Sequence, residues 1–354
     1  MRTATISRRQ LLAAGATTLA VPALARTADA QPAAADFKGE RMVVNSFGGP
    51  FGAAWKQHVV EPFQKTFNAQ LAVVDAITGE VTAKVLASRG NPQLDVVILG
   101  DSGAAILAQQ GLFEPLTEAT VPNLKELIGI ARLPGDVYAE FLFASEVLVY
   151  NKNQVKDPPT SWKDLYSPQY KQHILIPDLG NSVSGPVFLV HQAELNGGSV
   201  TNIDPGFEAL TRLKPNVITY WTSMQQFANM MSSGEAWLGV WSSDRAAALI
   251  KSGAPVALAP LQEKPALFGN AIGVVKNTKH LKLAQSYTNF VLSTNVQSNF
   301  LSAVMLAPTN KNAVLSAAAK PFVVDPNGAD VIDWATVAKE MPSWLDRWNR
   351  TITQ

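Results

Sequence analysis

The chain has 354 residues, a formal net charge of +1 and no cysteine, and 47% of its residues are apolar while 16% are charged. This composition is typical of a globular protein, and it excludes disulfides, thiolate metal sites and a cysteine nucleophile. The nearly balanced charge does not indicate a nucleic-acid-binding surface. Because the length exceeds that of a usual single hydrophobic core, we expect two lobes.

The first thirty residues have the pattern of an export signal. The basic start Ser7-Arg8-Arg9 precedes an uncharged apolar run, 11–25, that is too short to span a bilayer. Small residues at 23–25 and 28–30 are candidate cleavage sites. The arginine pair favours the twin-arginine route. The alternative, a chance pair on an amphipathic helix, is disfavoured because the run has no polar face. Loss of 1–30 removes four arginines and one aspartate, so the charge falls by three, from +1 to about −2.

Short apolar runs then alternate with stretches of helical period, the pattern of an α/β protein built on mainly parallel sheets. In chain order, we expect strands at 42–45, 71–74, 95–99, 147–151, 174–177, 237–241 and 271–275. Helices are expected at 54–67, 77–89, 104–110, 185–194, 245–251 and 281–292. No later segment is long and apolar enough to span a bilayer, so the mature protein is expected to be soluble.

Two kinds of chemistry find little support in the motifs. Gly100-Asp101-Ser102-Gly103 matches the tetrad around a protease nucleophile, which makes a secreted serine hydrolase using Ser102 a remote alternative. The upstream His58 lies in an expected helix, and Ala104 breaks the G-x-S-x-G pattern of other serine hydrolases. The four histidines are scattered, so we expect no metal site, no cofactor and no enzymatic activity.

Four segments carry a resemblance to a known family. These segments are Asn45-Ser46-Phe47-Gly48-Gly49, Leu94-Asp95-Val96-Val97, residues 159–178 and residues 270–310. The third is the most specific, because it resembles the signature W-x-D-L-x-x-P-x-Y-K-x-x-I-x-I-P-D. The chain resembles the periplasmic solute-binding proteins of ABC importers, in the branch related to spermidine and putrescine binders.

The resemblance implies an α/β, two-lobe periplasmic-binding-protein fold of type II, with a hinge and a ligand in the interlobe cleft. It assigns 36–145 plus 270–330 to lobe one and 146–269 to lobe two, with C-terminal helices at 331–354 packing on the lobes. Residues 1–30 remain the export signal. The mature protein is expected in the periplasm, after cleavage of the signal near residue 25–30. The implied partners are a small-molecule ligand and the membrane subunits of an ABC permease, and we expect a monomer that binds no nucleic acid.

Candidate ligand contacts follow the expected strands, because loops at the carboxyl ends of strands line such clefts. In lobe one they are Ser46, Phe47, Gly48, Asp101 and Ser102; in lobe two they are Glu146, Ser182, Ser184, Trp221, Trp241, Ser243 and Asp244. Each has a structural alternative. The glycines serve a helix entry, Asp101 and Asp244 cap helices, Glu146 faces outward, a serine caps the helix at 185, and the tryptophans are core residues.

The acids near these loops outnumber the bases, with Arg245 the only base beside them. An aromatic ring beside a carboxylate suits an organic cation, and a polyamine or another cationic amine is therefore the first hypothesis. Other solutes remain open: an amino acid derivative, an opine, a thiamine-like compound or a ferric ion. A ferric ion is disfavoured because no two tyrosines are adjacent. A binding protein that serves a chemoreceptor or sensor, and not an importer, would use the same closure of the two lobes on the ligand.

Overall fold

The fold is known from a computed structural model that describes residues 35–133, 135–180, 183–326, 329 and 331–354. Residues 36–354 form one compact unit. The expected export signal, 1–30, lies outside the described residues.

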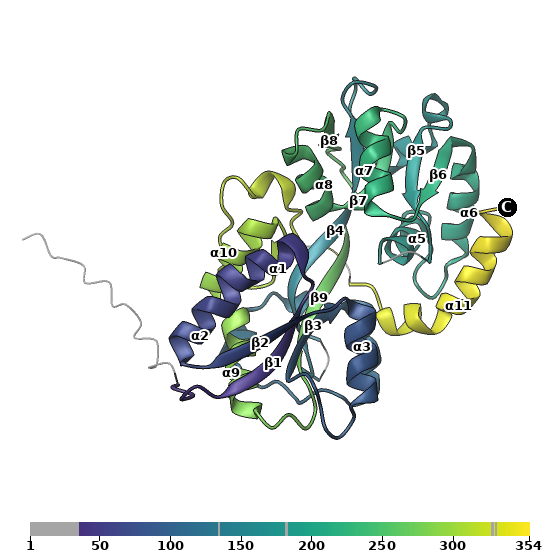
Figure 1. Cartoon of the computed structure of the whole chain (residues 1–354). Helices are drawn as coiled ribbons and strands as arrows, with labels where there is room; N and C mark the ends of the chain where they lie inside the picture. Colours follow the sequence, from purple (N-terminus) through teal and green to yellow (C-terminus); the bar gives the residue numbers. More distant parts are fainter. Residues whose placement is uncertain (1–34, 134, 181–182, 327–328, 330) are drawn as a thin grey trace, which may run out of the picture. The chain divides into compact units, whose positions relative to one another are not determined.

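The unit is built on a sheet of ten strands that runs in the order β2-β1-β3-β9-β4-β7-β5-β6, with β10 and β8 paired to β4 (Figure 1). The strands are β1 (Arg41–Ser46), β2 (Gln70–Asp75), β3 (Val96–Gly100), β4 (Ala139–Asn151), β5 (Ile174–Pro177), β6 (Val217–Trp221), β7 (Leu238–Ser242), β8 (Val256–Leu258), β9 (Ala266–Val274) and β10 (Ala307–Pro308). At one end of the sheet β1 is parallel to β2 and β3, and at the other end β5 is parallel to β6 and β7. The alternation of strands and helices in the sequence predicts such parallel strands.

Lobe one surrounds β2, β1 and β3, and its helices cover both faces. They are α1 (Gly49–Trp55), the π-helix η1 (Lys56–Val60), α2 (Glu61–Phe67), α3 (Thr78–Ala87), α4 (Asp101–Gln109), α9 (Leu281–Val291) and α10 (Thr294–Val304). The strand β3 is buried on both sides: Val97 and Leu99 share a core cluster with α3 and α4, whereas Val96 and Ile98 join the opposite cluster. That two-sided burial explains why β3 reads as a continuous apolar run.

Lobe two surrounds β7, β5 and β6. Its helices are α5 (Ser184–Leu195), α6 (Asp204–Leu213), α7 (Met224–Ser233) and α8 (Ser243–Lys251). Leu238 and Val240 of β7 belong to one core cluster, and Trp241 belongs to the cluster that α7 and α8 complete. Short 3₁₀ turns occur in both parts of the chain. In the lobe-one ranges they are η2 (Pro122–Glu126), η3 (Gly129–Ala131) and η7 (Lys320–Phe322), and in lobe two they are η4 (Trp162–Tyr166), η5 (Pro168–Tyr170) and η6 (Lys214–Asn216).

The long strands β4 and β9 lie at the centre of the sheet and join the two lobes (Figure 1). They pair antiparallel from Ala139↔Ile272 to Glu146↔Ala266, and the far end of β4 continues beside β7. The expected lobe boundaries, at 145/146 and 269/270, fall inside these two strands. A covalent connection through paired strands lets two lobes change their relative angle while the sheet stays hydrogen-bonded.

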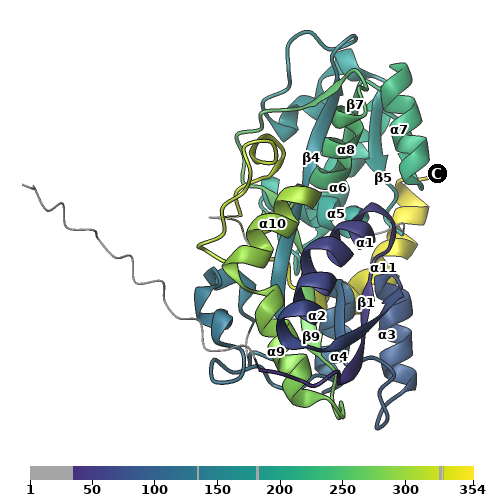
Figure 2. The same cartoon turned by 60° about the vertical axis from the view of Figure 1, so that its left-hand side comes forward.

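A single helix, α11 (Trp334–Thr351), occupies the C-terminal segment where several helices were expected. Its first part packs on α4 of lobe one. Its last part contacts lobe two, where Trp348 Nε1 donates to Asp178 Oδ2 at 3.3 Å and the Arg347 guanidinium lies 4.2 Å from the ring centre of Phe207. Figures 1 and 2 show this helix running along one side of both lobes. It is therefore a third connection between them.

Candidate functional site

The loop after β1 carries the first group of predicted contacts. Gly48 has φ +71°, a left-handed conformation that glycine adopts without strain, and the loop leads directly into α1. The rings of Phe47 and Phe51 pack with their centres 5.1 Å apart. Ser46 Oγ accepts a hydrogen bond from the Gly48 N–H at 3.4 Å. This geometry serves the helix entry, and a ligand contact by these residues stays a prediction.

Asp101 follows β3 and is 5% exposed. It is the first residue of α4, whose N-cap is Gly100, so the helix-capping alternative is wrong for its side chain. Its Oδ2 instead accepts from the Gly269 N–H of β9 at 2.6 Å. The carboxylate of Asp101 therefore ties lobe one to a strand that joins the lobes. Ser102 is the next residue of the same helical turn.

The structure brings Glu140 of β4, which was not among the predicted contacts, against Asp101. We call these two residues the Asp101–Glu140 pair. A Cβ on Gly269 would lie 2.8 Å from Asp101 Oδ1 and still closer to Glu140 Oε2, so a glycine is needed to make room for both carboxyl groups. Burial raises the pKa of each, and the charge of Asp101 raises the pKa of Glu140 further. The pair retains a proton where an ordinary carboxyl group has lost it.

A second group of acids gathers around Glu146, further along β4. Ser184 Oγ at the start of α5 donates to Glu146 Oε1 at 2.6 Å, and the charge of Asp244 acts on the same carboxylate. We call Glu146, Ser184 and Asp244 the Glu146 cluster. The N–H of Ser145 bonds Ser243 Oγ at 3.4 Å, which places Ser243 beside it. The structure thus brings four of the predicted lobe-two residues together.

Glu146 is 3% exposed, so the alternative of an outward-facing residue is wrong. Its Oε2 is buried and has no hydrogen-bond partner among the residues that the structure describes. Burial raises the pKa of Glu146 to about 7, against the lowering effect of the Ser184 bond. Arg245, the base next to Asp244 in the sequence, pairs with Asp244 at 3.5 Å. A buried carboxylate with a free oxygen is suited to a cationic group.

The two predicted tryptophan contacts of lobe two lie in its core. Trp221 is 3% exposed, and its Nε1 donates to the Val240 carbonyl at 3.0 Å. Trp241 is 5% exposed and packs on Phe227 with ring centres 4.2 Å apart. Both positions match the core-packing alternative. Ser182, the remaining predicted contact, lies outside the described residues.

Three of the four histidines have partners other than Ser102. His173 bonds the Glu235 carbonyl, His191 packs on Trp162, and His280 bonds Glu40. Over the described ranges, no three histidine, aspartate or glutamate side chains are grouped to hold a metal ion. Helices long and apolar enough to cross a membrane are likewise absent from those ranges.

Two α/β lobes connected by crossing strands define the class of two-lobe binding proteins. Residues 58–327 match the family model described as bacterial extracellular solute-binding protein. Because that match covers most of the chain, the chain belongs to this family.

Two curated relatives match over most of their own length. The spermidine/putrescine-binding periplasmic protein 1 of Haemophilus influenzae is 23% identical over 284 residues, covering 77% of this chain and 78% of that protein. The gamma-aminobutyric acid-binding protein of Pseudomonas aeruginosa is 24% identical over 341 residues, covering 89% and 93%. These relatives are binding proteins.

A solved structure, described as an ABC transporter from Clostridium perfringens, is similar with a TM-score of 0.79 and 28% identity. The similarity covers 88% of this chain and 100% of that one. The two-lobe fold predicted from the sequence is thereby confirmed.

Proposed function

We propose that this protein is the substrate-binding component of an ABC importer and captures a small cationic amine in the periplasm. Glu146 carries the proposal: it is a buried carboxylate with a free oxygen, located on the strand that joins the lobes. Asp244 adds a second negative charge, and Ser184 orients the carboxylate. An ammonium ion would donate a hydrogen bond to this oxygen and neutralise the charge of Glu146.

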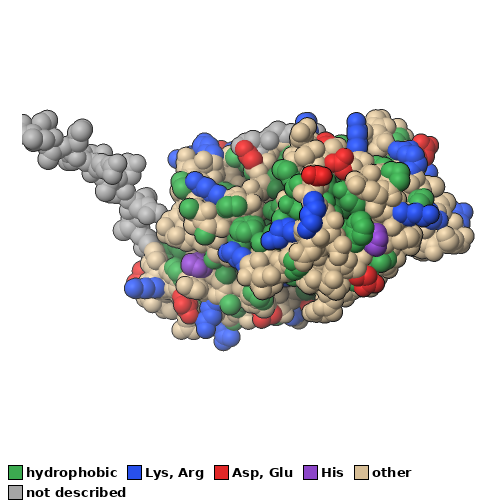
Figure 3. Space-filling view, turned by 90° about the horizontal axis from the view of Figure 1, so that it is seen from above, with side chains coloured by type: hydrophobic (Ala, Val, Ile, Leu, Met, Phe, Trp, Pro, Cys, Tyr) green, Lys and Arg blue, Asp and Glu red, His purple; other side chains and the backbone are tan. Residues whose placement is uncertain are grey.

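The relatives support an amine as ligand. Spermidine, putrescine and gamma-aminobutyric acid, named for the two relatives, all have a primary ammonium group. The outer surface is less informative. On the face seen in Figure 3, basic and acidic side chains are interspersed. Selection of a cation is therefore assigned to the buried acids.

The mechanism is a change in relative stability of two arrangements, with no covalent step. A ligand that contacts both lobes binds the closed arrangement more tightly than the open one and shifts the population towards it. The membrane subunits of the permease then recognise the closed form. The predicted contacts on the lobe-one side, Ser46, Phe47 and Gly48, are proposed to complete the site on closure.

Thermal-shift screening of putrescine, spermidine and gamma-aminobutyric acid tests the proposal. A ligand at 100-fold its Kd adds about 2.7 kcal/mol to the free energy of unfolding, which is a readily measured shift. Glu146→Gln and Asp244→Asn are each expected to weaken binding by roughly 1–3 kcal/mol. Glu208→Gln, an exposed change on α6, is the control and should bind as the wild type does.

Several outcomes would overturn the proposal. One is a thermal shift with a sugar or an anion and none with any amine. Another is unchanged amine affinity in both Glu146→Gln and Asp244→Asn. Transport is tested separately: a deletion strain should lose uptake of the labelled amine and regain it with the wild-type gene alone.

We also propose that residues 1–30 direct twin-arginine export. Replacement of Arg8 and Arg9 by lysine keeps the positive charge and removes the arginine pair that this route reads. The variant is expected to remain in the cytoplasmic fraction, while wild type reaches the periplasm. Equal periplasmic amounts of the two proteins would show that export uses another route.

A further inference from the structure

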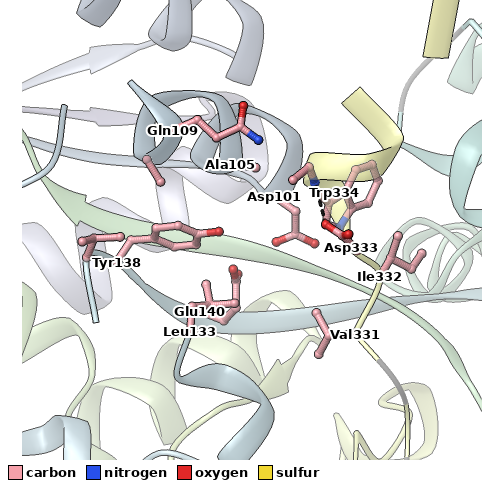
Figure 4. A pocket seen from close by; sticks show the side chains of 13 residues that line it. Asp101, Ala105, Gln109, Leu133, Tyr138, Glu140, Val331, Ile332, Asp333 and Trp334 are labelled. Carbon is pink, nitrogen blue, oxygen red and sulfur yellow. Dashed lines mark hydrogen bonds between the residues drawn. The ribbon is translucent and has the colours of Figure 1, made fainter. Parts of the chain in front are cut away.

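A cavity of about 340 Å³ lies between α4, the start of β4 and residues 331–335 (Figure 4). Asp101, Ala105, Ala108 and Gln109 line it from α4. Their spacing of four, seven and eight residues is one face of a helix, so the cavity follows the flank of α4. It is distinct from the Glu146 cluster, none of whose residues line it.

The polar end of the cavity is the Asp101–Glu140 pair. Both residues are buried, with exposed fractions of 5% and 2%. Asp101 Oδ1 and Glu140 Oε2 have no hydrogen-bond partner in the described part of the chain. Two ionised carboxylates cannot hydrogen-bond each other, whereas a shared proton or a cation between them would satisfy both oxygens. Among the described residues, no lysine, arginine or histidine lines the cavity.

The remaining walls suit the body of an organic ligand. Leu133, Val137 and Ile332 are apolar, and the rings of Tyr138 and Trp334 lie on either side of the carboxyl groups in Figure 4. A mostly apolar pocket of this volume, with a few convergent polar groups, has the composition of a small-molecule site.

We propose that this cavity is a second binding site, which takes a small organic compound with a primary ammonium group between Asp101 and Glu140. The ammonium replaces the proton that the pair otherwise shares, and the carbon chain lies along α4. Binding therefore releases a proton to solvent. The titratable groups facing the site are Asp101, Tyr138, Glu140 and Asp333.

The test uses n-butylammonium as probe and calorimetric titration of the full mature chain. A Glu146→Gln background removes the cation site proposed above, so that one site remains to be measured. In that background, Glu140→Gln is expected to lower the affinity at least about tenfold, because it removes the charge and keeps the shape. Titration in two buffers of different ionisation enthalpy should show proton release.

A second variant tests the cavity without touching the carboxyl groups. Ala108→Leu fills space on the flank of α4 and should abolish probe binding while leaving the pair intact. Equal affinity in Glu140→Gln, or equal binding of uncharged n-butanol, would overturn the second site. Those results would leave the Glu146 proposal standing, because its test depends on different residues.

Discussion

Glu140 and Glu146 lie on the same strand and are both nearly fully buried, yet their surroundings differ. Glu140 faces a second carboxyl group, and space for the two is made by Gly269. Glu146 instead accepts a hydroxyl hydrogen bond from Ser184 and has its like-charged neighbour, Asp244, at a half-buried position. Burial alone therefore does not define the role of a carboxylate. The neighbouring groups, a second acid for Glu140 and a hydroxyl donor for Glu146, decide how strongly each carboxyl group holds its proton.

The largest expected effect concerns the pH dependence of stability at Glu146. Its pKa is raised from 4.5 to about 7, so its contribution is complete below about pH 4.5 and is lost as the pH rises through about 7. Glu146→Gln does not titrate, so it should not lose stability in this way. The free energy of unfolding of the variant, relative to that of wild type, should rise by about 3 kcal/mol from about pH 4 to pH 8. Urea unfolding across that range measures the difference.

Asp333→Asn is the control for that series. Its hydrogen bonds, first to Thr336, lower the pKa of Asp333 below 3.8, so its contribution is lost only as the pH falls further. Across the same pH range the difference in the free energy of unfolding between Asp333→Asn and wild type should stay constant. A flat difference for Glu146→Gln as well would contradict the assigned environment of Glu146.

Gly269→Ala is expected to have the next largest effect, and it acts on the Asp101–Glu140 pair and not on the Glu146 cluster. The added methyl group collides with both carboxyl groups of the Asp101–Glu140 pair, and we expect a loss of about 2–3 kcal/mol in the free energy of unfolding. Gly79→Ala on α3 is the matched control, since its Cβ meets nothing within 4 Å. Adding Glu140→Ala to Gly269→Ala should recover part of the loss. Equal stability of Gly269→Ala and Gly79→Ala would refute the close packing of the two carboxyl groups against Gly269.

Ser184→Ala should affect only the Glu146 cluster. Its loss removes the hydrogen bond to Glu146 Oε1, raises the pKa of Glu146 further and costs about 1–2 kcal/mol above neutral pH. In a Glu146→Gln background the same change should cost less, because the charge is gone. A double-mutant cycle measures the coupling energy between Ser184 and Glu146. A coupling energy of zero would show that the two side chains do not interact.

Arg245→Gln is expected to have the smallest effect on stability. The pair between Arg245 and Asp244 is partly exposed, so its loss should change the free energy of unfolding by less than about 0.5 kcal/mol. Amine affinity should rise severalfold, because Asp244 loses its competing cation. A lower affinity, measured by calorimetry, would show that Arg245 assists the ligand.

Much of the fold was predictable because both faces of the parallel strands are covered. Two-sided burial produces the continuous apolar runs seen at β3 and β5, and these runs were placed within a residue or two. β4 was placed too short, starting at 147 where the strand begins at Ala139. Its first half includes the charged Glu140, which interrupts the apolar pattern.

The candidate site was predicted less completely. Glu146 was singled out because a charge inside an apolar run needs a partner, and the same signal exists at Glu140 immediately before Phe141. Glu140 was missed because its partner Asp101 is far away in the sequence. Trp221 and Trp241 show the opposite difficulty, since aromatic residues at strand ends serve cores and ligands equally well.

The sequence by itself determined the alternation of strands and helices, the family resemblance and the acidic character of the candidate loops. These are local properties, because they depend on the period of apolar residues and on which side chains follow each strand. Only the tertiary structure decided which acids meet. The pairing of β9 with β3 and β4 brings Gly269 and Glu140 to Asp101. The packing of α5 against the sheet brings Ser184 to Glu146. Long-range contacts of that kind set the burial and the charge of each carboxyl group, and hence its affinity for a proton or a cation.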